Sequence, residues 1–344
     1  MKRILIVRAS AIGDVVFASP FAAALKRTYP DAHVAWLVEP GIHTLLEADP
    51  CIDELILWPK GEWKALLQAK RFGAFVSTVR RFARELKSRR FDTAIDLQSL
   101  LKSGLLTWLS GAPRRIGLGS REGSQHLMTE VVPKGGDGGR ISSEYLYLAQ
   151  QLGLDTGAFL PRLCVAESTA ARADAVLAAH ALARGGYAVF APFTTRPQKH
   201  WFEDAWVALG PQVQGELGLT PVILGGPAER EAAERMAAAI PGAVSLAGQT
   251  GLAEAAALIE RAGLLIGVDT GLTHMGIAFN TPTVALFGST RPYLNTCRAN
   301  ARVIWLQLDC SPCRRRPTCH GAFTCLRDIR PERVLAEARE VLTA

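Results

Sequence analysis

The chain has 344 residues, of which 49% are hydrophobic, and carries a formal net charge of +7. This length exceeds one ordinary hydrophobic core and suits two domains of roughly 150 residues each. No apolar run reaches the roughly 18 residues that a membrane-spanning helix needs, and Arg8 and Asp14 interrupt the apolar N-terminus where a secretion signal would lie. We therefore expect a cytoplasmic protein whose seven cysteines are reduced.

The first part of the chain alternates between short apolar runs and helical patterns. Residues 3–8 predict a strand, which is followed by a turn and a helix that runs to about Tyr29. Residues 33–38 and 92–96 predict two further strands. Strands that alternate with helices indicate a parallel sheet with helices on both faces.

The positive charge concentrates in residues 60–90. This segment holds ten lysines and arginines against two acids, Glu62 and Glu85. Such a local field favours anionic partners, namely phosphates, acidic lipids or nucleic acid, although a solvated helix face has the same composition. The ten basic residues are Lys60, Lys64, Lys70, Arg71, Arg80, Arg81, Arg84, Lys87, Arg89 and Arg90.

The second part of the chain repeats the α/β alternation. Residues 142–182 are largely helical in pattern, and Gly185-Gly186 marks the restart. Two successive α/β units predict twin doubly wound domains that face a cleft, with ligands at the carboxyl ends of the strands. The predicted strands are 187–193, 221–226, 243–248, 264–269 and 283–288, and an amphipathic helix is predicted over 331–342. The predicted divisions are an N-terminal domain over 1–170, a linker over 171–185, a C-terminal domain over 186–330 and a final helix over 331–344.

The turn after the first predicted strand is Ser10-Ala11-Ile12-Gly13-Asp14. It holds a single glycine, so it lacks the G-x-G-x-x-G pattern of a dinucleotide site. Asp14 opens the first helix at the sheet edge where ligands bind, which makes it a candidate functional acid. Ser10 and Asp14 are both good helix caps, so a purely structural role is the alternative.

Two later turns predict an anion site. Residues 194–201 place two threonines and Lys199 just before a helix, which suits a diphosphate: hydroxyl and backbone donors hold its oxygens and the lysine adds a point charge. The strand 264–269 leads into Thr270-Gly271, where free N–H groups and a helix dipole meet. His274 follows, and on its own it could simply pack under this helix. Glu229 follows another strand at a position that suits a ribose hydroxyl.

Four cysteines lie within sixteen residues near the C-terminus, at 310, 313, 319 and 325. In a cytoplasmic protein such a cluster favours a metal ion over two disulfides. Zinc is the chemical default for four thiolates and iron is the alternative. The site would be structural because four thiolates leave no position open for a substrate. The predicted ligands are Cys310, Cys313, Cys319 and Cys325, and Arg314, Arg315 and Arg316 add positive charge to the same loop.

Several segments together resemble the ADP-heptose:lipopolysaccharide heptosyltransferases of glycosyltransferase family 9. They are SAIGDVVFASP (10–20), TTRPQKHW (194–201) and VDTGLTHMGIAFNTPTVALFG (268–288), in the family's order and spacing over nearly the whole chain. TTRPQKHW and DLQSLLKSG (96–104) are most similar to heptosyltransferase I. The cysteine cluster departs from the heptosyltransferase I pattern. The resemblance implies a GT-B fold, two Rossmann-like domains facing a cleft, and an enzyme on the inner face of the inner membrane.

The resemblance also implies an inverting, metal-independent transfer of heptose from ADP-L-glycero-D-manno-heptose to the Kdo region of lipid A. Asp14 is then the catalytic base, and burial in the cleft is expected to raise its pKa. Lys199 acts with it by meeting the charge on the leaving group. The implied donor contacts are Thr194, Thr195, Lys199, Glu229, Asp269, Thr270, Gly271 and His274. We assign the acidic acceptor to Ser10, Gly13, Lys60, Lys64 and Arg71.

Three alternatives remain at this point. One is a family member with another acceptor, such as a second core heptose or a protein. Another is a sugar-nucleotide epimerase, whose chemistry also uses paired α/β domains. The third is a nucleic-acid-binding protein whose fold is stabilised by a metal ion. This alternative would leave the predicted phosphate-binding loops of the second domain unexplained. We therefore expect ADP-heptose, an acidic acceptor and an anionic membrane surface as partners, and no nucleic acid.

Overall fold

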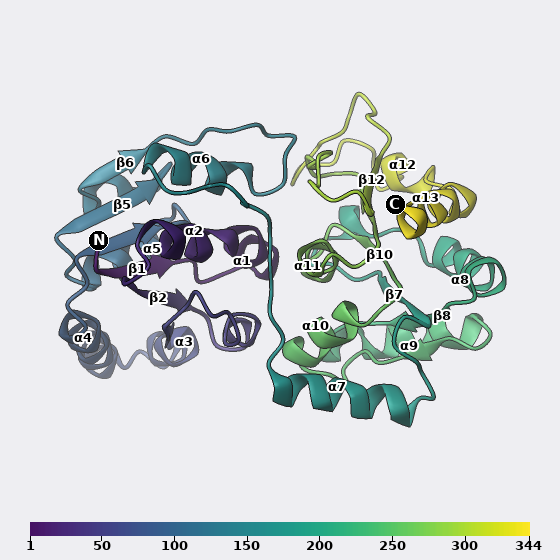
Figure 1. Ribbon diagram of the computed structural model, residues 1–344, viewed down its shortest axis with the longest axis horizontal. Coiled ribbons are helices and arrows are strands. Elements are labelled where there is room, and N and C mark those ends of the chain that lie inside the picture. Colours follow the sequence, from purple (N-terminus) through teal and green to yellow (C-terminus); the bar gives the residue numbers. More distant parts are fainter. The chain divides into compact units, whose positions relative to one another are not determined.

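In the computed structural model, which describes residues 1–344, the chain divides into two compact units (Figure 1). Unit 1 consists of Met1–Gly138 and Ser142–Cys164, and unit 2 consists of Gly139–Ile141 and Val165–Ala344. The short segment Gly139–Ile141 joins unit 2 through backbone hydrogen bonds to Asn295, whose carbonyl accepts from the Ile141 N–H at 2.9 Å. Unit 2 is therefore discontinuous in sequence.

The observed division differs from the predicted boundaries at 170 and 185. The helix α7 (Glu167–Ala179) belongs to unit 2, where it packs against α10 (Leu252–Glu260). Arg172 on α7 pairs with Glu254 at 2.7 Å, and Asp174 pairs with Arg261 at 2.9 Å. These ion pairs and the packing make most of the predicted linker a part of unit 2.

Unit 1 contains a six-stranded parallel sheet in the order β3-β2-β1-β4-β5-β6. Val7 of β1 lies in register with Leu37 on one side and with Asp96 on the other. This is the doubly wound strand order of dinucleotide-binding folds, in which the connections reverse direction between β1 and β4. The strands are β1 (Arg3–Val7), β2 (His33–Val38), β3 (Glu54–Leu57), β4 (Thr93–Asp96), β5 (Arg114–Leu118) and β6 (Glu130–Val132).

Helices cover both faces of this sheet because the side chains of β1 alternate. Ile4 and Ile6 pack on one face with α1 (Ile12–Ala18), α2 (Pro20–Thr28) and α6 (Ser143–Gln151). Leu5 and Val7 pack on the other face with α3 (Lys60–Gln68), α4 (Phe72–Ser88) and α5 (Leu101–Leu109).

The single helix predicted up to Tyr29 is two helices, α1 and α2. Pro20 begins α2 and supplies no N–H to continue the hydrogen-bond ladder of α1, so the helix ends at the residue before Ser19. The chain also contains four short 3-10 helices, which are η1 (Ile42–Leu45), η2 (Ser124–Leu127), η3 (Pro197–Lys199) and η4 (Pro227–Glu229).

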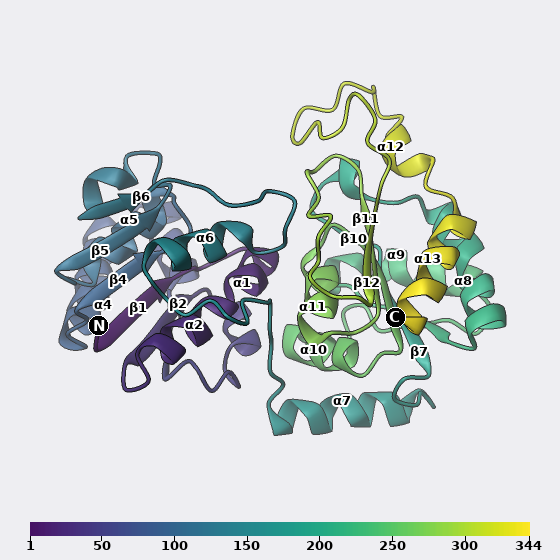
Figure 2. The same cartoon turned by 45° about the horizontal axis from the view of Figure 1, so that its top comes forward.

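Unit 2 repeats the same α/β architecture (Figure 2). Its second six-stranded parallel sheet has the order β12-β11-β10-β7-β8-β9. Its connections reverse between β7 and β10. The helices α8 (Glu203–Leu217), α9 (Arg230–Ala239), α12 (Thr324–Arg327) and α13 (Pro331–Thr343) contribute to the core on one face, and α7, α10 and α11 (Gly271–Phe279) form the other layer. The strands are β7 (Tyr187–Ala191), β8 (Thr220–Ile223), β9 (Val244–Ser245), β10 (Leu264–Val268), β11 (Thr283–Phe287) and β12 (Ala301–Trp305).

The predicted doubly wound α/β fold is confirmed in both units, and every predicted strand is present. Four further strands, β3, β5, β6 and β12, were not predicted, and β9 is only two residues long where six were expected. The final helix α13 packs on α8 and is therefore a part of unit 2.

No helix of the chain combines the length and the apolar character required to cross a lipid bilayer.

Candidate active site

Each sheet reverses its connections at one point, between β1 and β4 in unit 1 and between β7 and β10 in unit 2. Loops that leave the carboxyl ends of strands at such a point diverge and leave room for a ligand. The predicted residues occupy these loops: Asp14 follows β1, Lys199 follows β7 and Asp269 follows β10. Each unit therefore presents polar side chains where its topology favours binding.

In unit 1, Asp14 forms an ion pair with Arg8, with 2.6 Å between the carboxylate and the guanidinium. Arg8 is buried and also donates to the Leu97 carbonyl at 3.0 Å, so the guanidinium is fixed by β1 and by the loop after β4. The Asp14 carboxylate also accepts the Ala11 N–H at 3.3 Å, as a helix cap would. Within unit 1 the Asp14 side chain is 46% exposed, and the ion pair with Arg8 orients its carboxylate. The burial of Asp14 in a cleft stays a prediction.

Asp96 ends β4 beside this pair and was not predicted as a site residue. Its buried carboxylate accepts from the backbone N–H groups of Gln98 and Ser99 and from the Ser103 hydroxyl, at 2.9 to 3.2 Å. Gln98 in turn accepts the Ala9 N–H at 3.0 Å, which ties the loop after β4 to the loop that carries Asp14. Burial raises the pKa of Asp96 to about 6, although the three hydrogen bonds act to lower it.

We expect the substitution Asp96→Asn to flatten the pH dependence of stability. A carboxyl whose pKa rises from 3.8 in the unfolded chain to about 6 in the fold stabilises the fold fully below pH 3.8 and loses that contribution as pH rises through about 6. The loss corresponds to about 3 kcal/mol. Urea unfolding of wild type and variant across this range measures it. Parallel stability profiles for the two proteins would contradict the assignment.

In unit 2, an ion pair joins Lys199 and Asp269, with 2.7 Å between the ammonium and the carboxylate. Both side chains are about 15% exposed. Asp269 also contacts His274 Nε2 at 3.3 Å and accepts the Thr290 hydroxyl at 2.5 Å. Burial alone would raise the pKa of Asp269, but the hydrogen bonds and positive charges of His274 and Lys199 outweigh burial and hold this pKa well below its usual range. The carboxylate is therefore a fixed anion that positions Lys199.

Two members of this group, Thr290 and Tyr293, were not assigned from the sequence. The Tyr293 hydroxyl lies 2.7 Å from His274 Nδ1, and both side chains are buried. His274 therefore connects Tyr293 to Asp269 through its two ring nitrogens. Thr290 lies at a strand end that the sequence marked, whereas nothing in the sequence near Tyr293 indicates its role.

The remaining donor candidates surround this group. The Thr194 hydroxyl donates to the Asp269 carbonyl at 3.4 Å, and Thr270 precedes α11, whose first residue is Gly271. The first-turn N–H groups of α11 have no partner within the helix, and the helix dipole favours an anion there. Thr195 is exposed in the loop after β7, and Glu229 ends η4, beyond the carboxyl end of β8. The structure thus brings Thr194, Lys199, Asp269, Thr270, Gly271 and His274 together, with Thr195 and Glu229 on the neighbouring loops.

The acceptor candidates are not gathered into one cluster. Ser10 precedes α1 and Gly13 lies in its first turn, beside Asp14. Lys60 pairs with Glu39 at 2.8 Å, which compensates its charge within the protein. Lys64 and Arg71 are exposed and have no carboxylate partner.

The four clustered cysteines lie in the region from residue 310 to α12. Their thiol chemistry suits a metal ion, but no group of three or more His, Cys, Asp or Glu side chains is arranged to hold one. Burial raises the pKa of Cys325 to about 11, and the neighbouring charges of Cys313, Cys310 and Cys319 add to this shift. A structural zinc or iron site on Cys310, Cys313, Cys319 and Cys325 stays a prediction, which elemental analysis of the purified protein tests.

Comparison with known proteins identifies the family of this chain. Residues 79–323 match the family model described as glycosyltransferase family 9 (heptosyltransferase). The chain is 28% identical to lipopolysaccharide heptosyltransferase 1 of Pseudomonas aeruginosa, with 99% of this chain and 98% of that protein aligned. It is also 28% identical to lipopolysaccharide heptosyltransferase 2 of Salmonella typhimurium, with 99% of each chain aligned.

A solved structure extends the likeness to the fold. The Escherichia coli ADP-heptose lps heptosyltransferase II superposes with a TM-score of 0.77 at 26% identity, covering 100% of this chain and 99% of that one. These similarities confirm the family that the three sequence motifs indicated. The structural similarity also confirms the predicted GT-B type of fold. The chain belongs to glycosyltransferase family 9, the heptosyltransferases, and is a glycosyltransferase.

Proposed function

We propose that this enzyme moves heptose from ADP-L-glycero-D-manno-heptose to the Kdo region of lipid A during lipopolysaccharide inner-core synthesis. The observation that carries the proposal is the Lys199–Asp269–His274 group beside the first turn of α11, at the point where the unit 2 sheet reverses. This arrangement suits a diphosphate with no divalent ion. The similar proteins, named as lipopolysaccharide heptosyltransferase 1 and as ADP-heptose lps heptosyltransferase II, support ADP-heptose as the donor and lipopolysaccharide synthesis as the pathway.

The proposed reaction is a direct displacement with inversion at the anomeric carbon. Asp14 takes the proton of the acceptor hydroxyl as its oxygen attacks, the bond from the anomeric carbon to the diphosphate breaks, and ADP leaves. Arg8 holds the carboxylate of Asp14 in place. Lys199 and the first N–H groups of α11 meet the negative charge that develops on the leaving phosphate, which is where fixed donors lower the barrier.

The identity of the acceptor needs a separate argument, because a heptosyltransferase 1 and a heptosyltransferase 2 are both 28% identical to this chain. We favour the Kdo region on the motifs TTRPQKHW and DLQSLLKSG. Incubation with ADP-heptose and either Kdo-lipid A or heptosylated core, followed by mass spectrometry, separates the candidates. A gain of one heptose on Kdo-lipid A is expected. Product only on heptosylated core indicates a second-heptose transferase, and donor conversion without acceptor indicates an epimerase.

We further propose that the enzyme is cytoplasmic and rests on the inner face of the inner membrane through α4 and α5. Phe72 is 61% exposed and Val76 is 41% exposed, and with Arg80 and Arg84 they line a groove of about 460 Å³ along α4. On α5 the exposed apolar side chains, which recur on one helix face, are Leu101, Leu105 and Trp108. Apolar residues beside unpaired arginines are typical of a surface that binds anionic lipids.

The double substitution Arg80→Gln with Arg84→Gln is expected to weaken binding to phosphatidylglycerol-containing vesicles by roughly thirtyfold, at about 1 kcal/mol per basic residue. Vesicle co-sedimentation measures the affinity. Arg330→Gln with Arg333→Gln, two exposed arginines of unit 2, is the matched control and is expected to bind as wild type does. Equal binding to neutral and anionic vesicles would contradict the proposal.

A further inference from the structure

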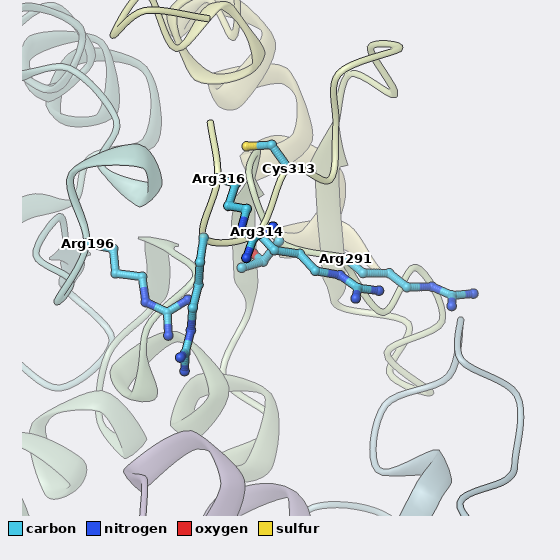
Figure 3. A pocket seen from close by; sticks show the side chains of 7 residues that line it. Arg196, Arg291, Cys313, Arg314 and Arg316 are labelled. Carbon is cyan, nitrogen blue, oxygen red and sulfur yellow. The ribbon is translucent and has the colours of Figure 1, made fainter. Parts of the chain in front are cut away.

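Unit 2 contains a second cationic feature that none of the roles above uses. A pocket of about 540 Å³ is lined by seven residues, five of which are arginines (Figure 3). None of the lining residues is acidic. Figure 3 shows Arg196 on one side of the pocket and Arg291 on the other, with Arg314 and Arg316 between them. The lining residues are Arg196, Thr290, Arg291, Cys313, Arg314, Arg315 and Arg316.

The protein itself does not neutralise these arginines. Several other arginines of unit 2 are paired, for example Arg172 with Glu254, Arg261 with Asp174 and Arg327 with Asp204. None of the five pocket arginines has a carboxylate within ion-pair distance anywhere in the chain. Guanidinium groups gathered without counterions repel one another, and each retains donors that bind carboxylate or phosphate in a forked geometry. The pocket therefore has the charge and the donors for an anion.

The protein backbone holds the walls of the pocket in place. The Arg314 N–H donates to the Ser289 carbonyl at 2.6 Å, and the Arg314 carbonyl accepts the side chain of Gln198 at 3.0 Å. These bonds connect the cysteine-containing loop to η3, in the loop after β7, and to the loop after β11. Thr290, which lines the pocket, also donates to Asp269. The pocket therefore adjoins the Lys199–Asp269 group and is built from other cations.

The amount of charge identifies the kind of ligand. The diphosphate of a nucleotide sugar carries two negative charges, and Lys199 with the first turn of α11 already suits them. Five further guanidiniums match a ligand with several phosphates or carboxylates, which arginine binds in bidentate fashion. The volume is within the range of small-molecule sites, about 300 to 1,000 Å³. We propose that this pocket binds the phosphate groups of a phosphorylated saccharide acceptor, an inference that rests on the proposed acidity of the acceptor.

The test compares Arg314→Gln/Arg315→Gln/Arg316→Gln with a control of equal charge loss, Arg302→Gln/Arg330→Gln/Arg333→Gln, in the full-length chain. Calorimetric titration with inorganic tripolyphosphate probes the pocket, and titration with ADP probes the donor group. The pocket variant is expected to bind tripolyphosphate at least about tenfold more weakly and ADP within about twofold of wild type. The control is expected to bind both ligands as wild type does.

Each other result overturns the inference. Equal weakening of ADP and tripolyphosphate would place the pocket in the donor site. Unchanged tripolyphosphate affinity would show that the arginines bind no phosphate, and an equal loss in the control would show a long-range charge effect only. Heptose transfer by the wild-type protein is measured in the same preparation. If the wild-type protein transfers heptose but the pocket variant shows no selective loss of tripolyphosphate affinity, this inference is wrong and the proposed function still holds.

Discussion

The substitution Asp14→Ala is expected to lower heptose transfer by about 10²–10⁴-fold while ADP binding remains intact, because in the proposed mechanism the residue acts on the acceptor hydroxyl and not on the nucleotide. The effect belongs to the chemical step, so the turnover rate falls whereas the calorimetric affinity for ADP does not change. Mass-spectrometric initial rates with ADP-heptose and the acceptor measure the first quantity. A rate near that of wild type would show that Asp14 is not the base.

The control for this prediction must separate the base from the helix cap, since the Asp14 carboxylate also accepts the Ala11 N–H and pairs with Arg8. Asp14→Asn keeps the shape and an acceptor oxygen for the cap but cannot take up a proton at neutral pH. We expect this variant to lose turnover to a similar extent and to keep the melting temperature closer to that of wild type than Asp14→Ala does. Full activity in Asp14→Asn would leave the residue with a structural role only.

The substitution Lys199→Ala is expected to weaken ADP binding and to lower turnover together. In the proposed mechanism Lys199 supplies a positive charge both to the bound diphosphate and to the leaving group, and losing one such donor costs about 3–4 kcal/mol, or roughly 10²–10³ in rate. Asp269 would keep His274 and Thr290 as partners, so its carboxylate remains held. Calorimetry with ADP and initial rates with ADP-heptose measure the two effects.

Lys199→Arg is the matched variant, because it keeps the charge beside Asp269 while it changes the geometry of the donors. We expect its ADP affinity to lie between those of wild type and Lys199→Ala. If Lys199→Ala bound ADP as tightly as wild type, the lysine would serve only to compensate Asp269, and the assignment to the diphosphate would be wrong.

The central strands of both sheets were predictable because they are short, continuous apolar runs buried on both faces, as in RILIV and LLIGV. The strands that were missed carry charge or lie toward the sheet edges. β5 begins with Arg114 and Arg115, β3 begins with Glu54, and β12 includes Arg302. The charged residues interrupt the continuous apolar run that marks a strand buried on both faces, so local composition does not indicate these strands.

The same limit applies to the site. Turn residues that follow predicted strands identify Asp14, Lys199 and Asp269, because the carboxyl ends of parallel strands meet at one edge. Their partners cannot be read from spacing: Lys199 and Asp269 are 70 positions apart in the chain, and Tyr293 reaches the group only through the fold. The pair of Asp14 with Arg8 was not predicted, because it depends on how the loops after β1 and β4 pack.

No continuous fragment of the chain contains all of unit 2 without also containing Ser142–Cys164 of unit 1. A fragment that starts at Val165 lacks Gly139–Ile141, so the backbone N–H and carbonyl of Asn295 lose the partners that they have in the intact protein. These groups lie two residues beyond Tyr293, whose hydroxyl contacts His274. The segment that pairs with Asn295 thus makes unit 2 depend on a piece of chain that lies within the sequence of unit 1.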